Sequence, residues 1–200
     1  MEKIKLGKTN LYVNRIGFGG IPIQRVCQSD VNEIILALLK EGINFIDTAR
    51  GYTVSEAFLG EALKGVRDKF IIATKSMSRD YNSMKEDILK SLENLKTDYI
   101  DIYQLHNVKS EEEYNRIMQN DGAYKALLEA KDEGKIHHIG ITSHNLDFLE
   151  SKIDLENFPF STIQVPYNIV EEKAESLFKK AVSKNIGTIV MKPLAGGAID

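Results

Sequence analysis

The feature that most constrains the fold of this chain is a regular alternation of short strand-like runs with longer helix-like segments. The strand-like runs are rich in β-branched and aromatic residues, and seven of them follow one another: residues 15–20, 44–47, 70–75, 99–105, 136–142, 162–165 and 187–192. A strand followed by a helix and then by another strand forms a right-handed crossover. The alternation therefore predicts an α/β protein with a parallel sheet covered by helices.

The segments between these runs have apolar residues at three- and four-residue spacing, which is typical of amphipathic helices. In the first of them the apolar residues are Val31, Ile34, Ile35, Leu38 and Leu39. We expect Ser29 or Asp30 to cap the start of this helix and Gly42 to end it. Residues 111–113, which are all glutamates, are expected in a first helical turn, where acidic side chains suit the helix dipole.

Two further observations favour a closed barrel over an open doubly wound sheet. No GxGxxG motif follows the first strand, where the sequence reads GFGGIP. Polar residues stand at the carboxyl ends of several predicted strands, and they are Asp47, Lys75, His106, Ser143, Gln164 and Lys192. A barrel brings all these ends onto one face. We therefore predict a (β/α)8 TIM-barrel type, incomplete at about seven βα units, with residues 3–14 forming an N-terminal β-hairpin.

Composition excludes several classes of protein. The chain has 200 residues, 42% of them hydrophobic, and a net charge of -3, which predicts one soluble domain over residues 1–200. The balanced charge gives no electrostatic footprint for nucleic acid, and no apolar run is long enough for a membrane span. The charged N-terminus lacks a signal core. Cys27 is the single cysteine, which excludes an intrachain disulfide and favours a cytoplasmic location.

Four side chains at neighbouring strand ends fit the chemistry of carbonyl reduction. Asp47 and Tyr52 follow the second strand, Lys75 ends the third and His106 follows the fourth. Reduction requires a proton donor, and an ammonium beside a phenol is expected to lower the phenol pKa from its usual value near 10. A carboxylate keeps the ammonium charged, and an imidazole can orient the carbonyl. Any one of these residues alone is more often a cap or a packing residue, but the set of four favours a catalytic site.

The sequence around these residues resembles the aldo/keto reductase family. DTARGYTVSEAFLGEAL is similar to the family signature, and ATK at Lys75 and QLH at His106 match the lysine and histidine that follow it. The resemblance extends from the hairpin to MKPLAGG, which is essentially the whole chain. It implies hydride transfer between NADP(H) and an aldehyde or ketone. In that reaction Tyr52 is the general acid, Lys75 and Asp47 tune it, and His106 orients the carbonyl.

The resemblance also implies a cofactor site across the strand ends. Ser143 and Gln164 are expected to contact the nicotinamide carboxamide. Many members have Ser-Asn after the fifth strand, whereas this chain has Ser143-His144-Asn145, so His144 supplies the second contact or Asn145 is only a helix cap. The remaining candidates for cofactor binding are Gly19, Gly20, Pro193, Leu194 and Gly196. No metal site is expected, because His137 and His138 point to opposite faces of a strand.

A complete member of the family continues beyond MKPLAGG, with an eighth strand and basic residues that hold the adenosine 2′-phosphate. The chain is therefore expected to be a C-terminally truncated barrel that binds NADPH weakly. Two alternatives remain open at this point. One is an inactive barrel fragment that acts as an interaction module, and the other is a barrel hydrolase or isomerase that uses Asp47 and Lys75 differently. Variable loops form the substrate pocket, so the residues do not define the natural substrate.

Overall fold

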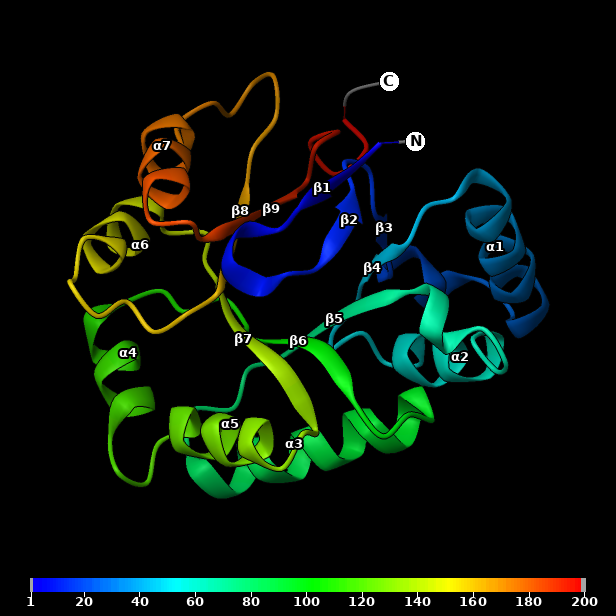
Figure 1. The fold of residues 1–200 in the computed structure, drawn as a ribbon, viewed down its shortest axis with the longest axis horizontal. Helices are drawn as coiled ribbons and strands as arrows, with labels where there is room; N and C mark the ends of the chain where they lie inside the picture. Colours follow the sequence, from blue (N-terminus) through cyan, green and yellow to red (C-terminus); the bar gives the residue numbers. More distant parts are fainter. Residues whose placement is uncertain (1, 199–200) are drawn as a thin grey trace.

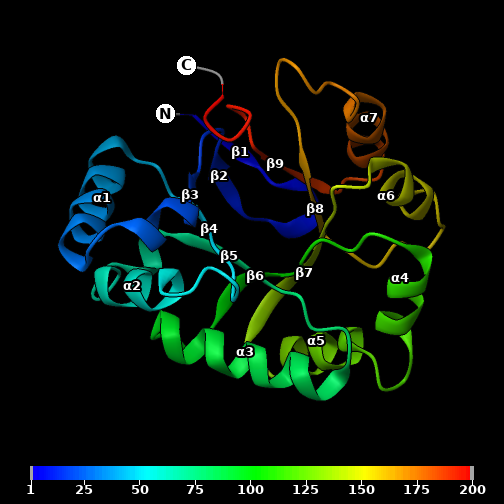
Figure 2. The same ribbon diagram turned by 180° about the vertical axis from the view of Figure 1, so that it is seen from behind.

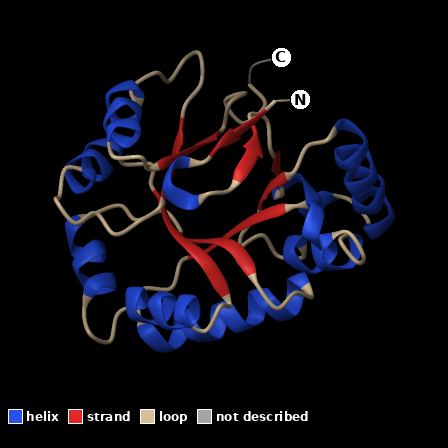
Figure 3. Ribbon diagram, viewed as in Figure 1, coloured by secondary structure: helices blue, strands red, loops and turns tan. Residues whose placement is uncertain are grey.

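A curled parallel sheet surrounded by helices forms the molecule, as a computed structural model describes it for residues 2–198 (Figure 1, Figure 3). Seven strands pair in chain order, each parallel to the next. They are β3 (Phe18–Gly19), β4 (Phe45–Asp47), β5 (Ile71–Ser76), β6 (Ile100–Leu105), β7 (Ile136–Thr142), β8 (Thr162–Pro166) and β9 (Gly187–Met191). This order confirms the predicted incomplete (β/α) barrel. Its first strand is shorter than predicted, because only Phe18–Gly19 of residues 15–20 pairs with β4.

The helices lie on the outside of the sheet (Figure 3). They are α1 (Gln28–Glu41), α2 (Ser55–Ala62), α3 (Tyr81–Leu95), α4 (Glu111–Met118), α5 (Ala123–Asp132), α6 (Leu146–Ile153) and α7 (Glu175–Ser183). Strand residues that point outward, such as Ile72, Tyr103 and Ile141, form one core with the inner faces of these helices. Among the helices of residues 2–198, none combines the length and apolar character needed to cross a bilayer.

The start of α1 differs from the prediction, whereas its end does not. Cys27, and neither Ser29 nor Asp30, is the N-cap residue. Asp30 lies at the third helical position, where its carboxylate accepts a hydrogen bond from the Cys27 backbone N–H at 2.9 Å. The acid thus satisfies a free N–H of the helix start as one half of a capping box. Gly42 ends the helix in the left-handed conformation, with φ 70°, as predicted.

The predicted N-terminal hairpin is present and closes one end of the barrel. Strands β1 (Lys3–Lys5) and β2 (Tyr12–Asn14) pair antiparallel, and a short 3-10 turn, η1 (Gly7–Thr9), joins them. The hairpin lies in front of the strands in Figure 1 and behind them in Figure 2. Its buried residues pack against side chains inside the barrel, and this cluster contains Leu6, Val13, Phe45, Ala73, Ile102 and Ile189. The amino ends of the strands are therefore sealed by apolar contacts.

The barrel interior changes from apolar to polar along the strands. Successive side chains of a strand alternate between the two faces of a sheet, so Ala73 and Lys75 on β5 both point inward. In the β5–β6 register Ala73 lies beside Ile102, and Lys75 lies beside Gln104. The apolar pair faces the hairpin, and the polar pair lies one layer nearer the carboxyl ends. The polar layer of the barrel interior therefore lies on the carboxyl side of the apolar layer.

Candidate active site

An ion pair between neighbouring strands lies at the base of the candidate site. Asp47 is the last residue of β4, and Lys75 is next to last in β5. The Lys75 side chain is 2% exposed, and its Nζ lies 2.6 Å from Asp47 Oδ2. Lys75 Nζ also donates a hydrogen bond to the Thr48 carbonyl at 2.8 Å. A buried ammonium requires such partners, because its desolvation is otherwise strongly unfavourable.

Tyr52 lies above this ion pair, on the loop between β4 and α2. Its backbone N–H donates to the Ala49 carbonyl at 3.0 Å, which forms a tight turn. The Tyr52 ring centroid is 5.1 Å from Lys75 Nζ. The ring meets that of His106 edge-on, with 6.2 Å between the centroids and 86° between the planes. The structure thus brings together all four residues that the sequence singled out at the ends of β4, β5 and β6.

The pKa of Tyr52 is shifted in the direction opposite to the expectation from sequence. Burial of the phenol raises this pKa well above its usual value near 10, and the Asp47 carboxylate raises it further. The expected lowering by Lys75 does not prevail, because the ammonium is paired with Asp47 at 2.6 Å. Tyr52 therefore holds its proton throughout the neutral range and is available as a hydrogen-bond donor.

His106 follows β6 directly and carries a neutral ring at neutral pH. Its backbone N–H donates to the Ser76 carbonyl at 2.8 Å, which continues the pairing of β5 with β6. The pKa of His106 is lowered to about 4. Burial of the ring is the main cause, and the positive charges of Lys75, Arg79 and His144 add to it. A neutral imidazole has one N–H donor and one acceptor nitrogen. His106 can therefore donate a hydrogen bond to a ligand oxygen without placing another positive charge beside Lys75.

The residues after β7 settle the role of Asn145 but leave the cofactor contact untested. Asn145 is the N-cap of α6, and its Oδ1 accepts a hydrogen bond from the Phe148 N–H at 3.1 Å. Ser143 is fully buried, and its hydroxyl donates to the Val108 carbonyl at 2.7 Å. His144 lies between them and is exposed. Asn145 is also exposed, but both ends of its amide are engaged, because its Nδ2 donates to the Lys109 carbonyl at 2.9 Å. Asn145 is thus a helix cap, and His144 stays the candidate for the second contact.

The two glycines at the carboxyl end of β3, Gly19 and Gly20, are not equivalent. A Cβ on Gly20 would lie 2.7 Å from Ser55 Oγ, so close packing against α2 requires glycine there. The Gly20 N–H donates to the Asp47 carbonyl at 2.7 Å, which ties this turn to the site. Gly19 has open space in the direction of a Cβ, so its backbone is accessible to close approach by a ligand.

The other candidates lie within β8 and in the turns after β9. Gln164 is buried in β8 and faces the interior, where its Oε1 accepts a hydrogen bond from Gln104 Nε2 at 3.0 Å. Pro193, Leu194 and Gly196 occupy exposed positions in the turns after β9. Within the described residues, the hydrogen bond from Asn168 Nδ2 to the Lys192 carbonyl, 3.1 Å long, links these turns to the loop after β8.

A buried polar network outside the barrel was not anticipated. Glu56, on α2, is 1% exposed and pairs with Arg50 at 2.7 Å between Oε2 and Nη1. Its Oε1 accepts hydrogen bonds from the hydroxyls of Thr74 and Ser91, each at 2.8 Å. Arg50 belongs to the Tyr52 loop, and its backbone N–H donates to the Lys75 carbonyl at 2.9 Å. The network thus fixes the Tyr52 loop to the strand that carries Lys75.

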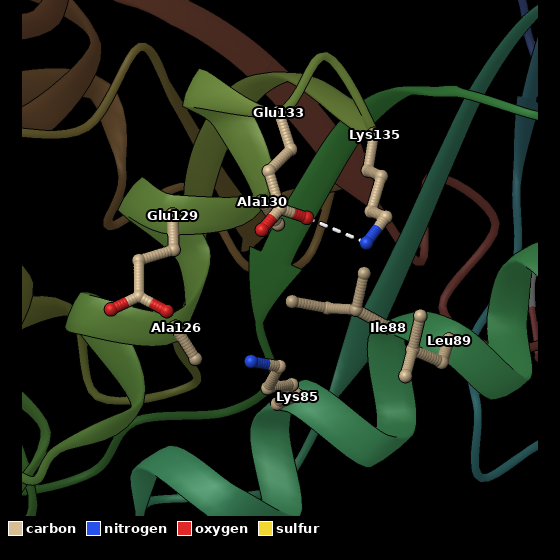
Figure 4. A pocket seen from close by; sticks show the side chains of 8 residues that line it. All are labelled: Lys85, Ile88, Leu89, Ala126, Glu129, Ala130, Glu133 and Lys135. Atoms are coloured by element: carbon tan, nitrogen blue, oxygen red, sulfur yellow. Dashed lines mark hydrogen bonds and ion pairs between the residues drawn. The ribbon is translucent and has the colours of Figure 1, made fainter.

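A groove between α3 and α5 lies outside the barrel and is separate from the candidate site (Figure 4). It is lined by Lys85, Ile88, Leu89, Ala126, Glu129, Ala130, Glu133 and Lys135. The Glu133–Lys135 ion pair, 2.5 Å long, lies at its edge (Figure 4). In the described part of the chain, no three His, Cys, Asp or Glu side chains form a group that could hold a metal ion.

A parallel barrel with polar side chains gathered at its carboxyl end has the architecture of the (β/α)-barrel enzymes. The model of the aldo/keto reductase family matches residues 15–200, and the chain belongs to this family. It is 33% identical to the L-galactose dehydrogenase of Arabidopsis thaliana, over 100% of this chain and 68% of that protein. It is 32% identical to the aldo-keto reductase YhdN of Bacillus subtilis, over 100% of this chain and 64% of that protein.

The solved structures include a close match in fold. The holo form of aldo-keto reductase AKR11C1 from Bacillus halodurans superposes with a TM-score of 0.82 at 29% sequence identity, and the alignment covers 98% of this chain and 68% of that chain. The chain therefore spans about two thirds of the length of the relatives that it matches.

Proposed function

We propose that this chain transfers a hydride between NADP(H) and the carbonyl group of an aldehyde or ketone. The observation that carries the proposal is the convergence of Asp47, Tyr52, Lys75 and His106 at the carboxyl end of the barrel. They supply a protonated phenol, a buried ion pair and a neutral imidazole at one end of the interior. Reduction of a carbonyl requires such a donor at the oxygen where negative charge develops.

The residues at the barrel mouth are suited to a nicotinamide cofactor. Gln164 presents a primary amide to the interior, and the open backbone at Gly19 permits close approach of a flat ring. A bound reduced nicotinamide supplies the hydride that adds to the carbonyl carbon. NADP(H) is proposed in preference to NAD(H) on the resemblance of the motifs, and both nucleotides belong in the test.

Tyr52 is proposed to be the proton donor. As the carbonyl carbon is reduced, the electron pair of the C=O bond moves to oxygen, and the Tyr52 hydroxyl gives its proton to that oxygen. An alkoxide is more basic than a phenolate, so the transfer is favourable even with a raised Tyr52 pKa. The ammonium of Lys75, 5.1 Å from the ring centroid, stabilises the phenolate that remains. In alcohol oxidation the same proton moves back to Tyr52.

His106 and Asp47 are proposed to support this transfer without exchanging protons. The neutral His106 ring, edge-on to Tyr52, can donate a hydrogen bond to the same carbonyl oxygen and so fix its direction. Asp47 holds Lys75 charged and in place through the 2.6 Å contact. A positively charged His106 would compete with Lys75 for the developing negative charge. The lowered pKa of His106 keeps the ring neutral and so prevents this competition.

The direct test is a spectrophotometric assay of the purified chain with each nucleotide. NADPH or NADH is supplied with an aldehyde, and NADP+ or NAD+ is supplied with L-galactose, because a relative with 33% identity is an L-galactose dehydrogenase. We expect nucleotide-dependent turnover in at least one direction. A folded chain that binds neither nucleotide contradicts the proposal and favours the interaction module. Hydrolysis of an activated ester without nucleotide favours the hydrolase.

A further inference from the structure

Gln104 is a buried interior residue that no part of the proposed chemistry uses. It lies on β6, two positions before His106, and its side chain is 0% exposed. Because side chains alternate along a strand, Ile102, Gln104 and His106 lie above one another on the inner face. Gln104 therefore lies in the layer of Lys75, above the apolar floor of the barrel and below His106.

The amide of Gln104 joins strands on opposite sides of its own strand. Its Nε2 lies 3.0 Å from Oε1 of Gln164 on β8 and makes a longer contact, 3.4 Å, with Oδ1 of Asp47 on β4. Gly140 on β7 makes the first contact possible. A Cβ there would lie 3.0 Å from Gln104 Cγ and 2.3 Å from Thr162 Oγ1. The missing side chain leaves the space through which Gln104 reaches Gln164.

These contacts determine which way both amides face. Asp47 pairs with the Lys75 ammonium through Oδ2, so its carboxylate can accept hydrogen bonds but cannot donate one. The Gln104 atom that faces Asp47 must therefore be the donor, Nε2. The same Nε2 faces Gln164, so the Gln164 atom that meets it must be the acceptor, Oε1. Gln164 is thereby left with its Nε2 amino group for a ligand.

We infer that Gln104 is a positioning residue that holds Gln164 as a hydrogen-bond donor toward the barrel mouth, under the control of the Asp47 carboxylate. The group selected by Gln164 is then a hydrogen-bond acceptor such as a carbonyl oxygen. The inference rests on the proposed function for the identity of that group, which is the carboxamide oxygen of the nicotinamide. A Gln164 amide that was free to turn could present either its oxygen or its NH2 group. It would then not distinguish hydrogen-bond acceptors from donors.

The alternative role for Gln104 is simple filling of the interior, and Thr162 provides a matched control. Thr162 Oγ1 lies in the same layer, is buried, and has no hydrogen-bond partner within the described residues. Thr162→Val removes a buried polar atom beside Gly140 without touching the contacts between Asp47, Gln104 and Gln164. Gln104→Met keeps the length of the side chain and removes both its donor and its acceptor.

The first experiment needs no cofactor and reads the side-chain amides of the 15N-labelled chain by NMR. We expect the Gln104 NH2 protons, which are bonded, to exchange with water at least about tenfold more slowly than those of Gln164. Asp47→Asn should reduce this difference, since an asparagine at position 47 can donate as well as accept. Slower exchange at Gln164 than at Gln104 in the wild type would overturn the inference, and Asp47→Asn tests it even if Gln104→Met does not fold.

The second experiment compares the affinity for NADPH with that for its thionicotinamide analogue, whose sulfur is a weaker acceptor than the carboxamide oxygen. We expect the wild type and Thr162→Val to prefer NADPH by about five- to tenfold, the loss typical of one hydrogen bond. Gln104→Met should lose this preference. Retention of the preference in Gln104→Met, or its equal loss in Thr162→Val, would overturn the inference. A wild type that binds neither nucleotide would contradict the proposed function alone, and the amide exchange would still decide the role of Gln104.

Discussion

The ammonium of Lys75 is directed at Asp47 rather than at the phenol of Tyr52. Lys75 Nζ lies 2.6 Å from Asp47 Oδ2, whereas it is 5.1 Å from the centroid of the Tyr52 ring. The Asp47 carboxylate raises the pKa of Tyr52, in addition to the larger effect of burial. Lys75 therefore acts on the resting tyrosine mainly by offsetting the charge of Asp47, and it acts directly on the phenolate formed when the proton leaves.

Replacement of Lys75 by methionine should reduce both stability and activity. Removal of one partner from a buried ion pair leaves an uncompensated charge, and it typically costs about 3 kcal/mol of the free energy of unfolding. Denaturant unfolding should show this loss in Lys75→Met. The Asp47→Asn/Lys75→Met double variant should recover most of the stability but none of the reductase activity. A double variant as unstable as Lys75→Met would mean that the loss came from packing.

The lowered pKa of His106 predicts a specific dependence of stability on pH. The pKa falls from 6.5 to about 4 on folding, so the unfolded chain binds the proton more readily than the folded chain. The contribution of the neutral ring is therefore fully present above pH 6.5 and is lost as the pH falls toward 4. Denaturant midpoints across this window should fall less steeply for His106→Gln than for the wild type. NMR titration of the His106 ring with a midpoint near 6.5 would contradict this prediction.

The ion pair between Arg50 and Glu56 should be a major contributor to stability. Arg50→Met leaves the carboxylate of Glu56, which is 1% exposed, without its cation, and we expect a loss of about 3 kcal/mol. Arg116→Met is the matched control, because Arg116 pairs at 2.7 Å with Asp121, whose side chain is 77% exposed. Exposed pairs contribute about 0–1 kcal/mol. Equal losses in the two variants, measured by denaturant unfolding, would show that the buried network has no special role.

The sequence predicted the fold because the alternation of strands and helices is long and regular. It also identified the four residues of the candidate site, since strand alternation and chain order determine which side chains reach one end of a barrel. Gln104 could have been found by the same reasoning, because it lies two positions before His106 on the same face of β6. The hydrogen bond between Gln104 and Gln164 could not have been predicted, because it depends on the space that Gly140 leaves between their two strands.

Other details depend on distances that a sequence does not contain. The direction of the Tyr52 pKa shift was wrong because it depends on the separation of Lys75 from Asp47 and from the phenol. The cap of α1 was misplaced because Asp30 can serve either as the N-cap or as the third residue of a capping box.

The measurement that tests the central claim most directly is the rate of carbonyl reduction by Tyr52→Phe. The substitution keeps the aromatic ring and removes only the proton that Tyr52 is proposed to donate. Tyr12→Phe, on the exposed edge of the hairpin, is the matched control and should behave as the wild type. We predict that kcat of Tyr52→Phe falls by a factor of about 100 or more, with an unchanged circular dichroism spectrum. A Tyr52→Phe variant that retains most of the wild-type kcat at neutral pH would contradict the assignment of Tyr52 as the proton donor.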